Sequence, residues 1–356
     1  MNADTRRAKM REPIYVDWAI TSTCNLDCRH CVGMNRDDLN HREAVQIARD
    51  IIDLSPRWVI LEGGEPVLRN DLPGIGDMLR EENIDVFVIT NGNAFNRERL
   101  QKLKTFSPKV LFSIDGADPD TYEHAKRGAD FDRAVEWAEK CSEEGLFHGI
   151  TTVLSKQNLG QEKDLIRLVE DLGGESITFI PLKPFGDDDE PQKYYSRNVL
   201  SPEEHERAVR RIYNVETNLD IFYDEPFLWN LASKHDFSVN GGSDGITIPD
   251  LKGCAASHSL YIQTDGDVRP CMFCPEELSL GNAAKEPLER IWSRTRQSET
   301  LSSWMNQDMR EGSCGECPQF ESCRGCLART AGLLKNTAGS DPSCPLTDGP
   351  GDPAPT

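Results

Sequence analysis

The sequence has no long apolar run and few basic residues for its length. None of its 356 residues belongs to a stretch approaching the roughly 18 consecutive apolar residues of a membrane-spanning helix, and the mean hydropathy is −0.55. The first residues contain no apolar run that could act as a signal peptide. Sixty acidic against 40 basic residues give a formal charge of −20, which repels phosphate backbones and excludes nucleic acid as an expected partner. These absences predict a soluble, cytoplasmic protein without a membrane span.

Cysteine, by contrast, is abundant, with 12 residues. The cytosol keeps thiols reduced, so clustered cysteines without a secretory signal favour metal or iron–sulfur sites over disulfides. Cys141 stands alone in a predicted helix and is expected to be a small buried hydrophobe. The others form an N-terminal and a C-terminal group, Cys24, Cys28 and Cys31, then Cys254, Cys271, Cys274, Cys314, Cys317, Cys323, Cys326 and Cys344.

From about residue 13, short β-branched runs alternate with longer segments of helical period, which predicts βαβ units and a parallel sheet. Six such units fall short of the eight of a closed barrel. We therefore expect an α/β fold, a partial (β/α)6 TIM-like barrel with its functional loops at the carboxyl ends of the strands. The strands are predicted at Tyr15–Ile20, Trp58–Leu61, Val86–Thr90, Val110–Ile114, Gly149–Leu154 and Ser176–Ile180. Helices are predicted at Arg42–Leu54, Gly74–Glu82, Phe131–Glu144, Glu162–Leu172, 201–219 and Leu288–Met305, and a loop at 184–200.

The chain divides into four predicted parts. A flexible arm covers residues 1–12, the barrel 13–235, a small cysteine-rich domain 236–346, and a disordered tail 347–356. The boundary near residue 236 is rich in Gly, Ser and Asp. The cysteine-rich domain has little room for a core of its own, so we expect metal to hold it together.

The first three cysteines directly follow the first predicted strand, in the pattern CxxxCxxC. Thiolates at these spacings can converge on one four-iron cluster, each binding one iron, and leave the fourth iron open to an outside ligand. Half of a zinc site is the alternative interpretation of Cys24, Cys28 and Cys31.

The next three predicted strands end in small or polar residues. Two glycines in Glu62-Gly63-Gly64-Glu65-Pro66 allow a backbone to approach a ligand closely, and Glu65 offers an acceptor for an ammonium group, although a simple tight turn would also use them. Asn91 follows the third strand, and Ser113 and Asp115 lie at the end of the fourth. A bound nucleoside would lie at this edge of such a sheet.

Together these residues resemble the radical S-adenosylmethionine (SAM) superfamily, whose CxxxCxxC signature has an aromatic residue, here His30, before the third cysteine. The resemblance covers about residues 13–185. It implies a [4Fe-4S] cluster on the three cysteines, SAM on the open iron, and reductive cleavage of SAM to a 5′-deoxyadenosyl radical. It also implies SAM contacts at Gly63, Gly64, Glu65, Pro66, Asn91, Ser113, Asp115 and Asn158.

The C-terminal cysteines resemble the SPASM domain, which binds one or two auxiliary [4Fe-4S] clusters. The pattern departs from that family in having two residues, not three, between Cys323 and Cys326. For the cluster that lacks an upstream fourth ligand, Cys274 is the available substitute, and an open coordination site is the alternative. A zinc ribbon built from Cys314, Cys317, Cys323 and Cys326 alone is the alternative to the auxiliary clusters. By analogy, one cluster would take Cys314, Cys317, Cys323 and Cys344, and the other Cys254, Cys271, Cys326 and Cys274.

The resemblance implies a radical SAM oxidoreductase supplied with electrons by ferredoxin or flavodoxin. Met272 stands where sulfatase-maturing relatives carry a general-base Asp, which argues against formylglycine formation. Only a short segment precedes the first strand, so a separate protein would recognise any peptide leader. We expect oxidative modification of a peptide. The alternatives are a small-molecule oxidoreductase, a haem-pathway side-chain decarboxylase, or a non-catalytic iron–sulfur electron carrier. No catalytic acid or base is assigned.

Overall fold

The computed structural model describes residues 12–31, 37–184, 189–235, 239 and 253–346. In this part of the chain one ten-stranded sheet has the order β12-β11-β10-β1-β3-β4-β5-β7-β8-β9, and a separate ribbon pairs β2 with β6. The strands from β10 to β9 run parallel, whereas β11 and β12 are antiparallel. The strands are β1 (Tyr15–Thr21), β2 (Asp27–Cys28), β3 (Trp58–Gly63), β4 (Asp85–Thr90), β5 (Lys109–Ser113), β6 (Lys126–Arg127), β7 (Phe147–Leu154), β8 (Ser176–Pro181), β9 (Asp220–Tyr223), β10 (Ser259–Ile262), β11 (Asp267–Arg269) and β12 (Gly281–Asn282).

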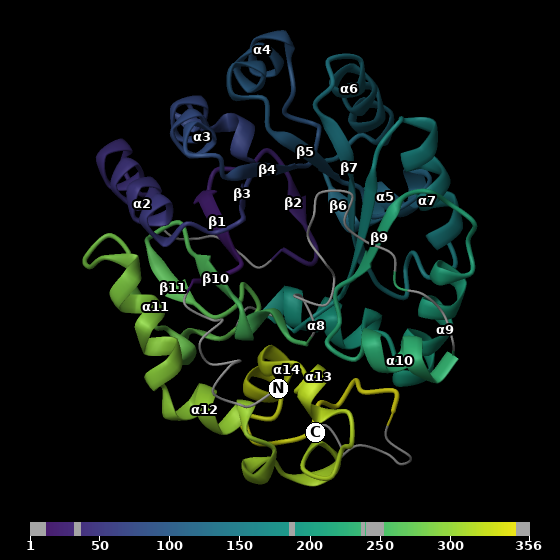
Figure 1. The fold of residues 1–356 in the computed structure, drawn as a ribbon. Coiled ribbons are helices and arrows are strands. Elements are labelled where there is room, and N and C mark those ends of the chain that lie inside the picture. The colour runs from purple at the N-terminus through teal and green to yellow at the C-terminus, as the bar shows by residue number, and fades with distance from the viewer. Residues whose placement is uncertain (1–11, 32–36, 185–188, 236–238, 240–252, 347–356) are drawn as a thin grey trace.

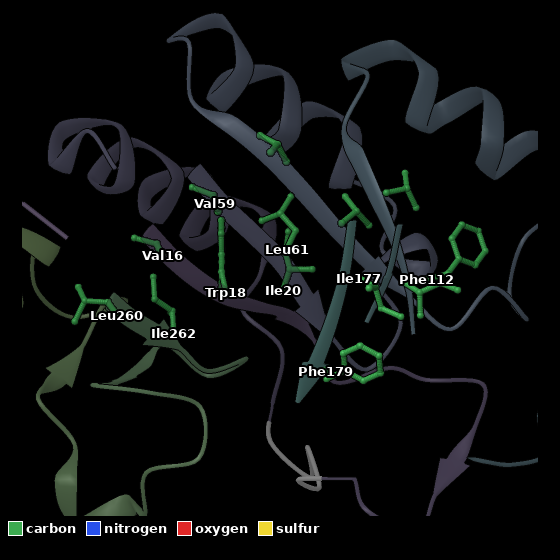
Figure 2. Close-up of a cluster of buried hydrophobic side chains, with 14 of the residues drawn as sticks. Val16, Trp18, Ile20, Val59, Leu61, Phe112, Ile177, Phe179, Leu260 and Ile262 are labelled. Carbon is green, nitrogen blue, oxygen red and sulfur yellow. The ribbon is translucent and has the colours of Figure 1, made fainter. Parts of the chain in front are cut away.

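The six predicted strands are confirmed as β1, β3, β4, β5, β7 and β8, and helices cover the outer side of the sheet in an open, partial barrel (Figure 1). Alternate side chains of each strand point to opposite faces. Val16, Trp18 and Ile20 belong to the buried cluster shown in Figure 2, with exposures of 0–1%. The opposite face, called here the inner face, holds half-buried side chains such as Phe87 and Ile89 of β4. On β4, the inner face is therefore less completely buried than the opposite face.

The helices are amphipathic, and their ends follow ordinary capping rules. Asn40 begins α2 with a capping box that includes Glu43, and Ser201 with Glu204 begins α9 in the same way. The helices are α2 (His41–Leu54), α3 (Leu72–Glu81), α4 (Arg97–Phe106), α5 (Pro119–Ala125), α6 (Phe131–Glu143), α7 (Glu162–Asp171), α8 (Asp189–Asn198), α9 (Pro202–Tyr213), α10 (Leu228–His235), α11 (Leu288–Gln297), α12 (Glu299–Met305), α13 (Phe320–Cys323) and α14 (Leu327–Gly332).

Three local predictions are wrong. The predicted loop 184–200 contains α8, because Tyr194 and Tyr195 pack with Leu182 in a small apolar cluster. The predicted helix 201–219 ends at Tyr213, and the chain then adds β9 to the sheet. The single predicted helix over Leu288–Met305 is two helices, because the Ser298 side chain caps α12. The predicted arm, except Glu12, the tail and nearly all of the boundary at 236–253 lie outside the described residues.

The cysteine-rich region continues the barrel. Strand β10 pairs in parallel with β1, with Tyr261 opposite Asp17. Trp292 and Trp304 belong to the same hydrophobic core as the barrel side chains, and Asp50 of α2 accepts a hydrogen bond from the Leu288 amide at 3.1 Å. The C-terminal part is therefore stabilised by apolar burial against the barrel, in addition to any metal that it binds. Among the described helices, none combines the length and apolarity needed to cross a membrane.

Candidate active site

The three N-terminal cysteines lie on one loop at the carboxyl edge of the sheet. Cys24 and Cys31 are exposed, and Cys28 is half-buried in β2. The ribbon pairs Cys28 with Lys126 of β6, and the Arg29 amide donates to the Ala125 carbonyl at 3.0 Å. These contacts fix the loop against the segment that follows α5 and leave its thiols presented to the outside of the sheet edge.

The glycines after β3 hold the other side of this loop. A Cβ on Gly63, which has φ +124°, would lie 2.5 Å from the Thr21 carbonyl oxygen, and one on Gly64 would lie 2.4 Å from that of Thr23. The Gly64 amide donates to Thr21 at 2.7 Å and the Glu65 amide to Thr23 at 2.8 Å. Glycine is therefore required here for close contact between the two backbones, independently of any ligand.

Glu65 is fully buried and joins the ends of β3 and β4. Its Oε1 accepts from the Thr90 hydroxyl at 2.8 Å and the Val67 amide at 3.3 Å, and its Oε2 accepts from the Asn91 amide at 2.8 Å. Burial raises the pKa of Glu65 to about 7 even though these hydrogen bonds favour the charged form. The Asn91 side chain donates to Asn25 at 3.0 Å, which brings the end of β4 to the cysteine loop.

A buried ionic group lies beside Cys28. Lys126 Nζ donates to Ser113 Oγ at 2.7 Å and lies 3.3 Å from Asp115 Oδ2, and His30 Nε2 is also 3.3 Å from that oxygen. Burial raises the pKa of Asp115, but Lys126 and His30 outweigh it and hold the pKa below its usual range. Sequence analysis missed Lys126, because its burial depends on the pairing of two distant short strands.

Asn158 has its side-chain groups engaged within the protein. Its Nδ2 donates to the Asp115 carbonyl at 3.0 Å and the Val153 carbonyl at 2.8 Å, and its Oδ1 accepts from the Ser155 amide at 2.8 Å. Asn158 is 1% exposed. In this structure it braces the ends of β5 and β7, whereas the predicted SAM contacts Gly63, Glu65 and Asn91 all border the cysteine loop.

The cysteine loop fits a four-iron cluster better than zinc. Burial raises the pKa of Cys28 to about 12, whereas the neighbouring charge of Lys126 lowers it, and Cys24 and Cys31 interact electrostatically with Cys28. Soft thiolates bind both zinc and iron–sulfur clusters, so the type of ligand does not decide between them. Within the described ranges, no three Cys, His, Asp or Glu side chains converge as ligands of a single ion. In a four-iron cluster each thiolate binds a different iron, so the three sulfur atoms lie farther apart than three ligands of a single ion would.

The eight C-terminal thiols fall into two groups. In the first, Cys274 raises the pKa of Cys271 and Cys254 raises that of Cys326, so the members of each pair are close neighbours, and Cys271 interacts electrostatically with Cys326. In the second, Cys323 interacts with Cys344 and Cys314, and Cys344 with Cys314 and Cys317. The assignment of these cysteines to two clusters stays a prediction. The lone Cys141 is fully buried on α6.

Two buried arginines, both missed from the sequence, organise the segments that carry these thiols. Arg310 donates to the carbonyls of Trp304, Arg324, Ala338 and Gly339 at 2.6–3.1 Å. These bonds tie Arg310 to three segments, namely α12, the residue after α13 and the turn at 338–339.

Arg329 of α14 lies between two carboxylates, Glu225 just after β9 and Asp341, at N–O distances of 2.6–2.7 Å. Asp341 also accepts from the Cys326 amide at 2.8 Å. Through Arg329, the barrel is joined directly to a segment that carries a predicted cluster ligand.

Comparisons with known proteins find a match for the barrel and a match for the cysteine-rich region. The family model of the radical SAM superfamily matches residues 18–169, and that of the SPASM iron–sulfur cluster-binding domain matches 254–327. An AdoMet-dependent heme synthase of Methanosarcina barkeri is 26% identical, with 95% of this chain and 97% of that protein covered. The mycofactocin maturase MftC of Mycolicibacterium smegmatis is 27% identical, with 96% and 84% covered. The crystal structure of Streptococcus suis SuiB bound to S-adenosylmethionine has a TM-score of 0.72 at 19% identity, covering 97% of this chain and 80% of that one.

Proposed function

From the premise that this chain belongs to the radical SAM superfamily and carries a C-terminal SPASM domain, we propose that it oxidatively modifies a peptide. It is a radical SAM enzyme that binds SAM, a [4Fe-4S] cluster and auxiliary iron–sulfur clusters. When bound, these cofactors supply the reductive cleavage of SAM and an acceptor for an electron from the substrate. The chain supplies the cysteine loop, the residues around it and the inner face.

The grouping of the eight C-terminal thiols carries the proposal. With Cys274 included, each group has enough thiols to ligate a four-iron cluster completely, which suits electron transfer rather than direct binding of substrate to iron. A net two-electron oxidation of the substrate follows from that arrangement. A low-potential donor such as ferredoxin or flavodoxin would supply the first electron. We propose a cytoplasmic enzyme, because the reducing cytosol keeps clustered thiols available for metal.

A peptide substrate is supported by two observations. Similar proteins include a mycofactocin maturase and a subtilosin biosynthesis protein, whose names denote peptide products or maturation. In addition, the inner face carries Asp17 and Glu62, each with a buried oxygen that accepts no hydrogen bond among the described residues, and N–H donors of a peptide suit such acceptors better than the carboxylates of a tetrapyrrole. A separate peptide-recognition protein would present the leader of the precursor.

Side-chain decarboxylation of a tetrapyrrole is the second candidate, favoured by the match to an AdoMet-dependent heme synthase over nearly the full length of both chains.

We expect the anaerobically reconstituted enzyme, given SAM and dithionite, to convert a short precursor peptide encoded beside its gene. Mass spectrometry should show net loss of two hydrogens from the peptide. Conversion of an iron coproporphyrin with loss of carboxyl carbons, and no change in the peptide, would replace the proposal with the second candidate.

We expect Cys274→Ser to alter one auxiliary cluster and leave the SAM-binding cluster intact. Cys274 is 2% exposed and its thiol is a close neighbour of that of Cys271, so a weaker hydroxyl ligand should change the Mössbauer spectrum of that cluster alone. Formation of 5′-deoxyadenosine without substrate should persist, while peptide turnover falls. Cys141→Ser is the matched control, because this thiol is buried away from both groups. A Cys274→Ser spectrum identical to that of the native protein would show that another ligand fills the position.

A further inference from the structure

Two acidic side chains lie next to each other on the inner face, on neighbouring strands. The register of β1 with β3 places Asp17 opposite Ile60 and Ala19 opposite Glu62. Because side chains alternate along a strand, Asp17 and Glu62 point to the same face, one pleat repeat apart. Val16 points the other way, into the buried cluster shown in Figure 2. Both carboxylates therefore face the inside of the partial barrel.

One oxygen of each carboxyl group has no hydrogen-bond partner within the part of the chain that the structure describes. Asp17 Oδ1 and Glu62 Oε1 are buried and accept no hydrogen bond there. Glu62 is only 9% exposed, and buried carboxylates without a partner are strongly disfavoured. Burial raises the pKa of Glu62 to about 7, and burial together with the charges of Glu62 and Asp224 raises that of Asp17. Among the described residues, no salt bridge to either carboxyl group is found.

The pair lies between the two predicted cofactor regions. Glu62 directly precedes Gly63, whose backbone contacts the cysteine loop. On the other side, Tyr261 of β10 is opposite Asp17 and interacts electrostatically with Cys271 of the first C-terminal thiol group. The Tyr261 hydroxyl is directed to Gln263 at 3.3 Å, so it does not satisfy the carboxylates. A substrate group bound by Asp17 and Glu62 would therefore lie between the cysteine loop and the first C-terminal thiol group.

The chemistry of the pair selects one kind of ligand. A divalent cation would require further oxygen ligands, and among the described residues no third Asp, Glu, His or Cys converges with these two. An ammonium or guanidinium group has several N–H donors and can bond both carboxylates at once.

We propose that Asp17 and Glu62 form the recognition site for a cationic side chain of the peptide substrate. That side chain would resemble lysine or arginine. This inference rests on the proposed function, since it names the class of peptide that the same site would take.

The test measures binding rather than turnover. The full chain, reconstituted anaerobically, is titrated with acetylated and amidated peptides that differ only in one lysine or norleucine, a side chain of similar length without the charge. The native protein should bind the lysine peptide roughly tenfold more tightly or better. The double variant Asp17→Asn, Glu62→Gln should bind the two peptides about equally.

Asp50→Asn is the matched control, because Asp50 is a 9%-exposed carboxylate of α2 that accepts hydrogen bonds from Gln46 and Leu288 outside the inner face. It should keep the lysine preference. Asp17→Asn with Glu62→Gln should also unfold at a temperature no lower than that of the native protein, because it removes buried charges that have no partner. A marked loss of thermal stability would assign the pair a structural role and overturn the inference.

The remaining outcomes are also decisive. Equal binding of both peptides by the native protein would overturn the inference, and so would weaker SAM binding by Glu62→Gln, because SAM itself would then be the cation. Tight binding of Mn²⁺ that the double variant loses would do the same. Conversion of a peptide without any basic residue would overturn this inference and leave the proposed function standing, whereas tetrapyrrole conversion would overturn the proposed function.

Discussion

Replacing Cys24, Cys28 and Cys31 together by Ala should abolish SAM cleavage and remove about four of roughly twelve irons from the anaerobically reconstituted protein. The three thiols lie on one loop at the sheet edge, and two of them are exposed, so their loss removes little buried surface. The loop itself is held by backbone contacts of Gly64 and Arg29, which the substitutions keep. The C-terminal thiol groups are untouched.

The measurements for this triple variant are iron content, the Mössbauer spectrum and dithionite-driven formation of 5′-deoxyadenosine. The remaining iron should carry the spectrum of the auxiliary clusters. Cys141→Ala is the matched control, since it removes a thiol buried in the core at α6 and should keep the full iron content. Wild-type rates of 5′-deoxyadenosine formation in the triple variant would refute the assignment of the SAM-binding cluster to this loop.

Local patterns were sufficient to predict much of this molecule. The six strands follow from short β-branched runs, whose burial in a parallel sheet requires apolar side chains. The family follows from CxxxCxxC with Gly63-Gly64-Glu65 after the next strand, and both family models confirm it. Close spacing in sequence limits which thiols can meet, as for Cys271 and Cys274, whereas the assignment of the C-terminal cysteines to two clusters stays a prediction.

The sequence could not predict features that depend on distant contacts. The pairing of β10 with β1 joins segments more than 200 residues apart in the register Tyr15 to Ser259. Lys126 is buried by the short ribbon with Cys28, and no local periodicity marks such a pair. Strand β9 is too short to distinguish from the end of α9 by pattern alone. The division at residue 236 remains a prediction, because the boundary lies almost entirely outside the described residues.

Arg329→Met should strongly destabilise the junction between the barrel and the cysteine-rich region. Arg329, Glu225 and Asp341 have side-chain exposures of 0–1%, and the arginine is bonded to both carboxylates. Removing it leaves two buried carboxylates without a counter-charge, which costs about 3–5 kcal/mol where one partner of a buried ion pair is lost. Because Asp341 also accepts from the Cys326 amide, we expect a lower melting temperature, loss of auxiliary iron and faster proteolysis of the C-terminal part.

Two further variants test whether the lost charge of Arg329 or another effect of the substitution causes the destabilisation. Arg294→Met breaks an exposed pair with Glu286, whose side chains are 44% and 24% exposed, and should leave the melting temperature unchanged. Arg329→Met combined with Glu225→Gln and Asp341→Asn should recover part of the stability, because neutral amides need no counter-charge. If the triple variant is no more stable than Arg329→Met, the destabilisation comes from lost packing around Arg329. The buried charges would then contribute little to holding the cysteine-rich region on the barrel.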